Sequence, residues 1–168
     1  ILSLKQKDGA VILILGRRES GKTVLALRIA QVIDRPTYAV TPEQSPPPWV
    51  TELKLEQLSE QPPPYSTIIM DDLPAYMSQR DYNDPFVRVV EHLIPVVRHR
   101  RKLILIFCSQ SSALADKFVL DSDVVCLKQP NMLFADLERP SVVKMYRESL
   151  PILEGLSVKK HAYLYSEF

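Results

Sequence analysis

Short, unbroken apolar runs alternate along this chain with segments in which apolar positions recur at a helical period. The runs contain many Val, Ile and Leu residues and show no alternation of polar and apolar positions, which is typical of parallel strands covered on both faces. We therefore predict five buried strands, at Ala10–Leu15, Thr37–Val40, Ser66–Met70, Leu103–Cys108 and Val124–Leu127.

Helical patterns lie between these runs, at Lys22–Ile33, Pro85–Arg100 and Ala113–Leu120. In the second, Asn83 or Asp84 can cap a helix that has proline in its first turn. Pro95 falls inside the same pattern and predicts a kink or an early end. Because strands and helices alternate, we expect an α/β fold with a mostly parallel central sheet flanked by helices.

Residues 41–65 and 129–168 depart from this alternation. The first segment contains "TPEQSPPPW" and "QPPPY" and is interpreted as a proline-rich insertion of rigid surface connectors. A rim that touches a partner or a neighbouring subunit is the alternative. The second segment predicts a short helix from Ser141 and a closing strand near Ala162–Tyr165. With 168 residues, the chain is expected to form one domain, 1–168.

Net charge and cysteine content exclude few classes of function. The net charge is +1, so the chain as a whole has no basic footprint for nucleic acid, and any basic surface must be local. Cys108 and Cys126 lie inside apolar runs, which predicts buried free thiols of a reducing compartment.

Targeting signals are not evident in this sequence. It lacks the charged and apolar regions of a signal peptide, and no apolar run reaches the roughly 18 residues that span a bilayer. It also begins with Ile1 rather than Met, which suggests an excised domain. We expect a cytoplasmic protein of a bacterial, archaeal or virus-infected cell, or a virion-associated one.

The stretch "GRRESGKT" follows the first predicted strand directly. It fits the phosphate-binding pattern G-x-x-x-x-G-K-[ST], in which glycines let the backbone curl so that amide groups face phosphate oxygens. The lysine reaches the β and γ phosphates, the threonine hydroxyl holds Mg²⁺, and the helix that follows places its positive end beneath the anion. ATP is therefore predicted to bind Gly16, Arg17, Arg18, Glu19, Ser20, Gly21, Lys22, Thr23 and Val24, with the two arginines facing solvent as an alternative for them.

Two adjacent carboxylates end the third predicted strand, in "STIIMDDL". In P-loop NTPases an acid at this place holds Mg²⁺, and the next residue is often a carboxylate that polarises the attacking water. We assign Asp71 to the metal together with Thr23, and Asp72 to the water.

The block "RHRRKLILIFCSQSS" places a basic cluster before a buried strand and polar residues after it. Gln110 is the candidate to sense the γ-phosphate or the attacking water, and Ser111 or Ser112 is the candidate helix cap. Three uses stay open for the basic cluster: a solvated helix end, arginine fingers acting on a neighbouring subunit, or contact with the DNA backbone. As fingers, Arg98 and Arg101 join Lys22, Asp72 and Gln110 as predicted catalytic residues.

These motifs together resemble the FtsK–HerA superfamily of P-loop ATPases, and within it the genome-packaging ATPases of poxvirus-type and membrane-containing-phage viruses. The residues that carry the resemblance are "GRRESGKT", "IIMDDL" and "RHRRKLILIFCSQ", within residues 10–128. The double Asp is familiar in that group, whereas the wider superfamily usually has Asp-Glu. The chain is also similar to filamentous-phage assembly ATPases of the zonula-occludens-toxin type, whose membrane anchor would lie outside this segment.

The resemblance implies a RecA-like core that assembles into a ring, often a hexamer, with ATP at subunit interfaces and double-stranded DNA passing through the centre. A capsid or membrane-anchored partner would lie outside this chain. Two other classes of function stay open at this point. One is a small-molecule kinase, with "AYMSQRDYNDP" (75–85) as a short lid, and the other is a nucleotide-dependent switch without turnover.

Overall fold

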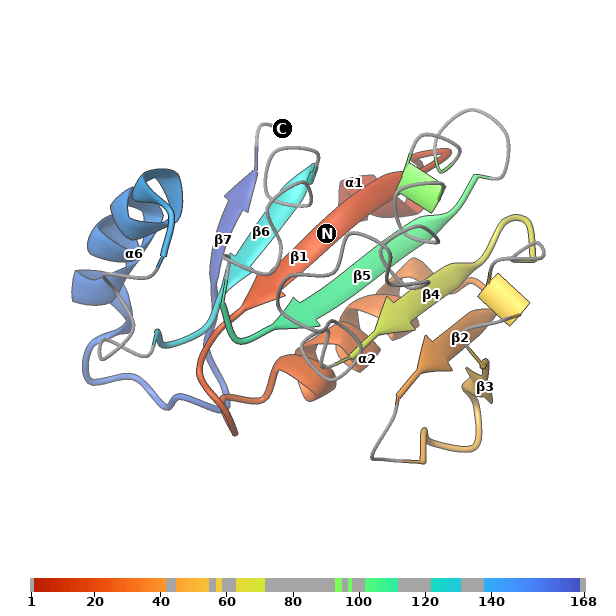
Figure 1. Cartoon of the computed structure of the whole chain (residues 1–168), viewed down its shortest axis with the longest axis horizontal. Helices are drawn as coiled ribbons and strands as arrows, with labels where there is room; N and C mark the ends of the chain where they lie inside the picture. The colour runs from red at the N-terminus through yellow and green to blue at the C-terminus, as the bar shows by residue number, and fades with distance from the viewer. Residues whose placement is uncertain are drawn as a thin grey trace, which may run out of the picture.

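A seven-stranded sheet forms the centre of the described part of the chain (Figure 1). The computed structural model describes residues 2–41, 45–54, 57–58, 63–71, 93–94, 97, 102–111, 122–130 and 138–166. The strands are β1 (Ala10–Leu15), β2 (Thr37–Val40), β3 (Thr51–Glu52), β4 (Thr67–Met70), β5 (Ile104–Ser109), β6 (Val124–Leu127) and β7 (Tyr163–Ser166). The described helices are α1 (Leu2–Lys5), α2 (Lys22–Ile33) and α6 (Pro140–Leu153).

The strand order is β3-β2-β4-β5-β1-β6-β7, and β7 pairs antiparallel with β6 while the other pairs are parallel. The predicted mostly parallel α/β sheet is therefore confirmed. The register places Leu15, the last residue of β1, opposite Ser109 of β5 and Leu127 of β6. The segments that follow these three strands consequently leave the sheet side by side, at its carboxyl edge.

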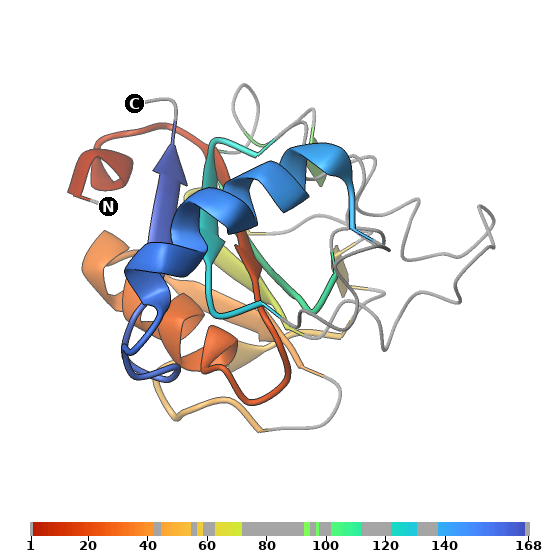
Figure 2. The same ribbon diagram turned by 90° about the vertical axis from the view of Figure 1, so that its left-hand side faces the viewer.

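Both faces of the sheet are covered, as continuous apolar strands require. Val11, Leu13 and Leu15 of β1 belong to one buried cluster, which includes Val142 and Tyr146 of α6. The intervening β1 residues belong to the other cluster, with Ile29 and Ile33 of α2; they are Ala10, Ile12 and Ile14. Figure 2 shows α2 and α6 on different sides of the strands. Full burial of each Leu, Ile or Val side chain is worth about 1.5–3 kcal/mol, so these layers supply most of the stability.

Several predicted boundaries agree with the structure. The strands Ala10–Leu15, Thr37–Val40 and Val124–Leu127 and the helix Lys22–Ile33 have the predicted bounds. Residues 113–120 lie outside the described part of the chain, as do most of residues 85–100. Of the latter, Leu93 and Val97 are described and buried.

Two predictions about the irregular segments need correction. The insertion 41–65 is more than a pair of connectors, because Thr51 and Glu52 pair with β2 as the edge strand β3. The helix predicted from Ser141 is not short: α6 has 14 residues and includes Pro151. Pro140 at its start has the φ angle that a helix needs. Pro151 lies inside the helix, where its missing N–H removes one backbone hydrogen bond.

Polar side chains at the amino edge of the sheet have structural partners. The Arg35 side chain, 7% exposed, donates hydrogen bonds to the carbonyl oxygens of Lys7 and Lys102 and stacks 4.2 Å from the centre of the Tyr65 ring. Asp123 accepts a hydrogen bond of 2.8 Å from the amide of Val11. These contacts involve the segments that enter five strands, β1, β2, β4, β5 and β6, so these side chains serve as scaffolding at the amino edge.

Candidate nucleotide site

The loop between β1 and α2 is fastened at its start to the strands on either side. The amide of Gly16 donates to the carbonyl of Ser109 at the end of β5. The amide of Arg17 donates to the carbonyl of Gln129, just beyond β6. Gly21 then adopts a left-handed backbone, with φ of 83°, immediately before the first turn of α2. This strand, loop and helix arrangement is the one that the phosphate-binding pattern predicts.

Glycine is required at position 16 because of its neighbours. A Cβ atom there would lie 2.5 Å from the Cβ of Lys128 and 2.9 Å from the hydroxyl of Ser20. Ser20 is itself fully buried, and its hydroxyl has no hydrogen-bond partner among the described residues. The beginning of the loop is therefore packed tightly against the segment that follows β6.

The two residues assigned to Mg²⁺ are in direct contact. The Thr23 hydroxyl donates a hydrogen bond of 2.7 Å to a carboxylate oxygen of Asp71. Thr23 is in the first turn of α2, and Asp71 directly follows β4. The structure thus brings together a hydroxyl and a carboxylate, the hard oxygen donors that Mg²⁺ prefers.

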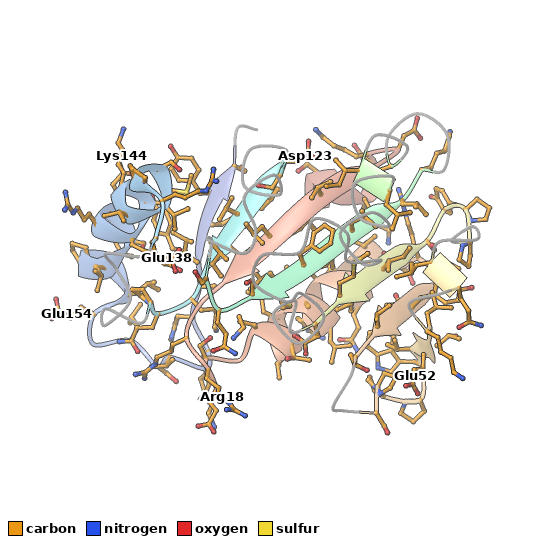
Figure 3. The ribbon with its side chains drawn as sticks, viewed as in Figure 1. Arg18, Glu52, Asp123, Glu138, Lys144 and Glu154 are labelled. Carbon is orange, nitrogen blue, oxygen red and sulfur yellow. The ribbon has the colours of Figure 1, made fainter. Side chains whose placement is uncertain are left out.

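Lys22 lies over the loop that precedes it. Its ammonium group donates a hydrogen bond of 3.1 Å to the carbonyl of Arg17, so the cation sits above the curled backbone. Arg17, Arg18 and Glu19 are exposed, and so is Val24, with 67% of its surface accessible. Figure 3 places Arg18 at the carboxyl edge and Asp123 at the opposite edge. The exposed side chains here are therefore two cationic, one anionic and one apolar, with Lys22 half-buried beside them.

Gln110 follows β5, the strand that lies between β4 and β1. Its predicted position at the tip of the strand beside the P-loop strand is observed, and the side chain is exposed. The neighbouring Ser109 hydroxyl donates to the carbonyl of Ser111 across 2.9 Å. This turn directs the chain away from the sheet at the point where the segments after β1 and β4 also emerge.

Both cysteines are buried and free, as predicted. Burial raises the pKa of the Cys108 thiol well above its usual range, and the nearby Asp71 carboxylate raises it further. Burial also raises the pKa of Cys126 to about 12. Both groups are therefore neutral thiols at physiological pH, and Cys108 is a buried neighbour of the Asp71 carboxylate.

Three predicted catalytic residues cannot be placed. Asp72, Arg98 and Arg101 lie outside the described residues, and so does the kinase-lid candidate at 75–85. Their assigned roles stay predictions. The residues that the structure brings together are the P-loop, Thr23, Asp71 and the strand end that carries Gln110.

Sequence reasoning missed one residue at this edge, Lys128. It directly follows β6, it is 2% exposed, and its ammonium group donates a hydrogen bond of 3.1 Å to the carbonyl of Lys159. Burial lowers the pKa of this ammonium group. The sequence "DVVCLK" could have identified Lys128, because this lysine directly follows a predicted buried strand. The same position after a strand was the reason for selecting Asp71.

Comparison with known proteins gives structural relatives but no relatives by sequence. No protein-family model matches the chain, and no curated protein sequence matches it. The crystal structure of B204, the DNA-packaging ATPase from Sulfolobus turreted icosahedral virus, superposes with a TM-score of 0.65 at 11% sequence identity, over 96% of this chain and 98% of that one. The chain therefore shares its fold with this protein.

The corresponding protein of Sulfolobus turreted icosahedral virus 2 is also similar. Its complex with AMPPCP superposes with a TM-score of 0.62 at 12% identity, covering 96% of this chain and 94% of that one. Its complex with ATP-gammaS gives a TM-score of 0.58 at 13% identity, over 95% and 92%. The fold expected from the resemblance to packaging ATPases is thus confirmed, with superpositions that cover 95–96% of this chain.

Proposed function

We propose that this chain is an ATPase that couples ATP hydrolysis to the movement of DNA during viral genome packaging. The observation that carries the proposal is the hydrogen bond of 2.7 Å between Thr23 and Asp71. It brings a hydroxyl and a carboxylate together near the loop that would cradle the phosphates, and these two groups would serve as oxygen ligands for Mg²⁺. A loop that served only to turn the chain would not need this pair.

The P-loop residues would bind the triphosphate. Backbone amides of the loop and the amino end of α2 would face the phosphates, and Lys22 would exchange the Arg17 carbonyl for the β and γ phosphates. Among the described residues no group of three or more His, Cys, Asp or Glu side chains gathers to hold a metal, so Thr23 and Asp71 would hold Mg²⁺ jointly with phosphate oxygens. When bound, Mg²⁺ neutralises charge that develops on the phosphoryl group.

Hydrolysis also needs groups that position water and stabilise charge. Asp72 is our candidate to accept the proton of the attacking water, and Gln110 to orient that water toward the γ-phosphate. Arg98 and Arg101 are the candidates to stabilise the transition state from a neighbouring subunit. These four roles are proposals, supported by the order of the motifs along the chain.

Coupling to DNA is proposed from likeness of fold to a DNA-packaging ATPase. We infer a homo-oligomeric ring, hexameric in our preferred form, with ATP at subunit interfaces and double-stranded DNA in the central channel. The net charge of +1 means that contact with DNA would depend on a local basic surface. None of the described helices combines the length and apolarity that a membrane crossing requires.

The first experiment measures ATP hydrolysis across a protein dilution series, with and without double-stranded DNA. Specific activity that rises with protein concentration, and again with DNA, supports a ring with shared active sites. Flat turnover that ignores DNA contradicts the motor and leaves a plain ATPase. Turnover that appears only with an added phosphate acceptor would indicate a kinase, and nucleotide binding without turnover a switch.

Variants separate the proposed roles. Lys22→Ala should weaken nucleotide binding and hydrolysis together, whereas Asp72→Asn should preserve binding and abolish hydrolysis. An Arg98→Ala/Arg101→Ala variant, inactive alone, should regain activity when mixed with Lys22→Ala, because a mixed interface can pair an intact P-loop with intact arginines. If mixing restores nothing, the arginines do not act across subunits.

A further inference from the structure

The segment after α6 returns to the P-loop. Within it, the backbone of Lys159 lies over Gly21: a Cβ atom added at Gly21 would be 3.2 Å from the Lys159 carbonyl oxygen and 3.6 Å from its Cα. Figures 1 and 2 agree, with the blue turn beside the loop that leads into α2. The turn comprises residues 157–161 and is closed by hydrogen bonds from the amides of Lys160 and His161 to the Ser157 carbonyl.

Lys128 joins this turn to the loop. Its Cβ packs against Gly16, its backbone amide donates to the Leu15 carbonyl across 2.7 Å, and its ammonium group donates to the Lys159 carbonyl. The Lys128 side chain therefore reaches from Gly16 to the backbone of Lys159, which in turn lies next to Gly21. The contact links residues 31 positions apart in sequence.

Burying the Lys128 ammonium group has an unfavourable desolvation free energy. Placing an ammonium group at 2% exposure removes it from water, and an apolar side chain of similar volume is often tolerated equally well or better in such a place. The Lys159 carbonyl is an acceptor at the rim of an anion site, where its negative end would repel phosphate. Donation from Lys128 offsets that repulsion and fixes the direction of the carbonyl.

We propose that the turn 157–161 is a wall of the nucleotide site, and that Lys128 is the positioning residue that holds this wall against the P-loop. The ligand class is a nucleoside triphosphate, so the inference rests on the proposed nucleotide-binding function. Lys159 and Lys160, both exposed, give this turn two positive charges, and the Lys159 backbone lies next to Gly21 of the loop. Lys128 itself acts through the turn and is not a catalytic residue.

The test compares Lys128→Met with wild type, using Lys144→Met on the exposed face of α6 as the control (Figure 3). Lys128→Met keeps the apolar stem and removes the donor. We expect an unchanged or higher melting temperature, about tenfold weaker binding of a fluorescent ATP analogue, and faster hydrogen exchange at the amides of residues 160 and 161. A purely structural lysine would lower the melting temperature and leave affinity unchanged in the folded fraction.

A second variant keeps the inference testable if Lys128→Met does not fold. Lys160→Pro removes the amide that bonds to Ser157 and opens the turn at an exposed position, while Lys160→Ala keeps that amide and controls for charge. Wild-type nucleotide affinity in Lys160→Pro or in folded Lys128→Met would overturn the inference. If wild type itself binds no nucleotide, the proposed function fails instead, and exchange at residues 160 and 161 still reports whether Lys128 positions the turn.

Discussion

The hydroxyl of Thr23 donates to Asp71 across 2.7 Å, although the two residues are 48 positions apart. The contact joins the first turn of α2, which follows β1, to the residue after β4. It therefore links segments that follow two strands separated in the sheet by β5. A hydroxyl and a carboxylate held at this distance are already arranged to share a divalent cation, because each keeps further lone pairs available.

Removing either member of this pair should stop hydrolysis. We expect Thr23→Val and Asp71→Asn each to lower the rate by roughly 100-fold or more, because both remove a ligand of the same cation. The double variant should be little worse than either single one, since the two residues act as a unit. Steady-state kinetics over a range of Mg²⁺ concentrations tests this. Asp8→Asn, at an exposed ion pair with Lys102, is the control, and additive losses would contradict a shared site.

A methyl group at position 16 should distort the P-loop. Gly16→Ala would bring a Cβ within 2.5 Å of the Lys128 Cβ, so loop and segment must separate. We expect nucleotide affinity to fall at least about tenfold and stability by about 1–3 kcal/mol, the usual cost of overpacking. Gly155→Ala is the control for backbone strain without a steric clash: its φ is positive, at 79°, but its Cβ would have no neighbour within 4 Å. It should cost about 1 kcal/mol from backbone strain and leave affinity intact. Isothermal calorimetry and thermal unfolding measure both quantities.

Arg35 should be a major determinant of stability and not of activity. Arg35→Met leaves the carbonyls of Lys7 and Lys102 without their donor, which predicts a loss of about 2–4 kcal/mol in the free energy of unfolding. Arg35→Lys should recover little, because one ammonium group cannot reproduce the planar fork that reaches two carbonyls. Urea unfolding gives the free energies, with the exposed Arg28→Met as the control. A wild-type midpoint for Arg35→Met would contradict the anchoring role.

The buried thiol of Cys126 should make the fold less stable at alkaline pH. Its pKa is raised to about 12 in the folded state, against about 8.5 for an unfolded cysteine. The folded state therefore retains a proton that the unfolded state releases. The stabilising effect is complete below about pH 8 and should fall by about 1.4 kcal/mol per pH unit above pH 9. Urea unfolding under reducing conditions measures this slope, and Cys126→Ala should lack that part of it. Equal slopes would contradict the assignment.

Much of the scaffold around the site was predictable because it depends on local sequence. The strand Ala10–Leu15, the loop after it and the helix Lys22–Ile33 are specified by continuous apolar residues, two glycines and a helical period. Asp71 and Gln110 were found for a related reason: a polar residue that ends a buried strand must emerge at the carboxyl edge. The contact of Thr23 with Asp71 follows once β4 and β1 belong to one parallel sheet.

Other features depend on packing that no local pattern reports. The edge strand Thr51–Glu52 is two exposed residues, too short for any alternation to be visible. The contact of Lys128 with Lys159 exists because β7 pairs antiparallel with β6 and brings the preceding turn back to the P-loop. Only a short helix was predicted from Ser141, whereas α6 has 14 residues and continues past Pro151, a residue type that local propensity disfavours inside a helix.

The reversed direction of β7 has a practical consequence for experiments on single molecules. Ser166 pairs with Val124 at the start of β6, so β7 runs toward the amino edge of the sheet, away from the P-loop (Figure 1). A biotin handle or fluorophore attached at Ser166 would therefore tether the protein by the edge opposite the P-loop. Nucleotide would reach the loop without passing the support, and the turn 157–161 would stay free to report its own movements.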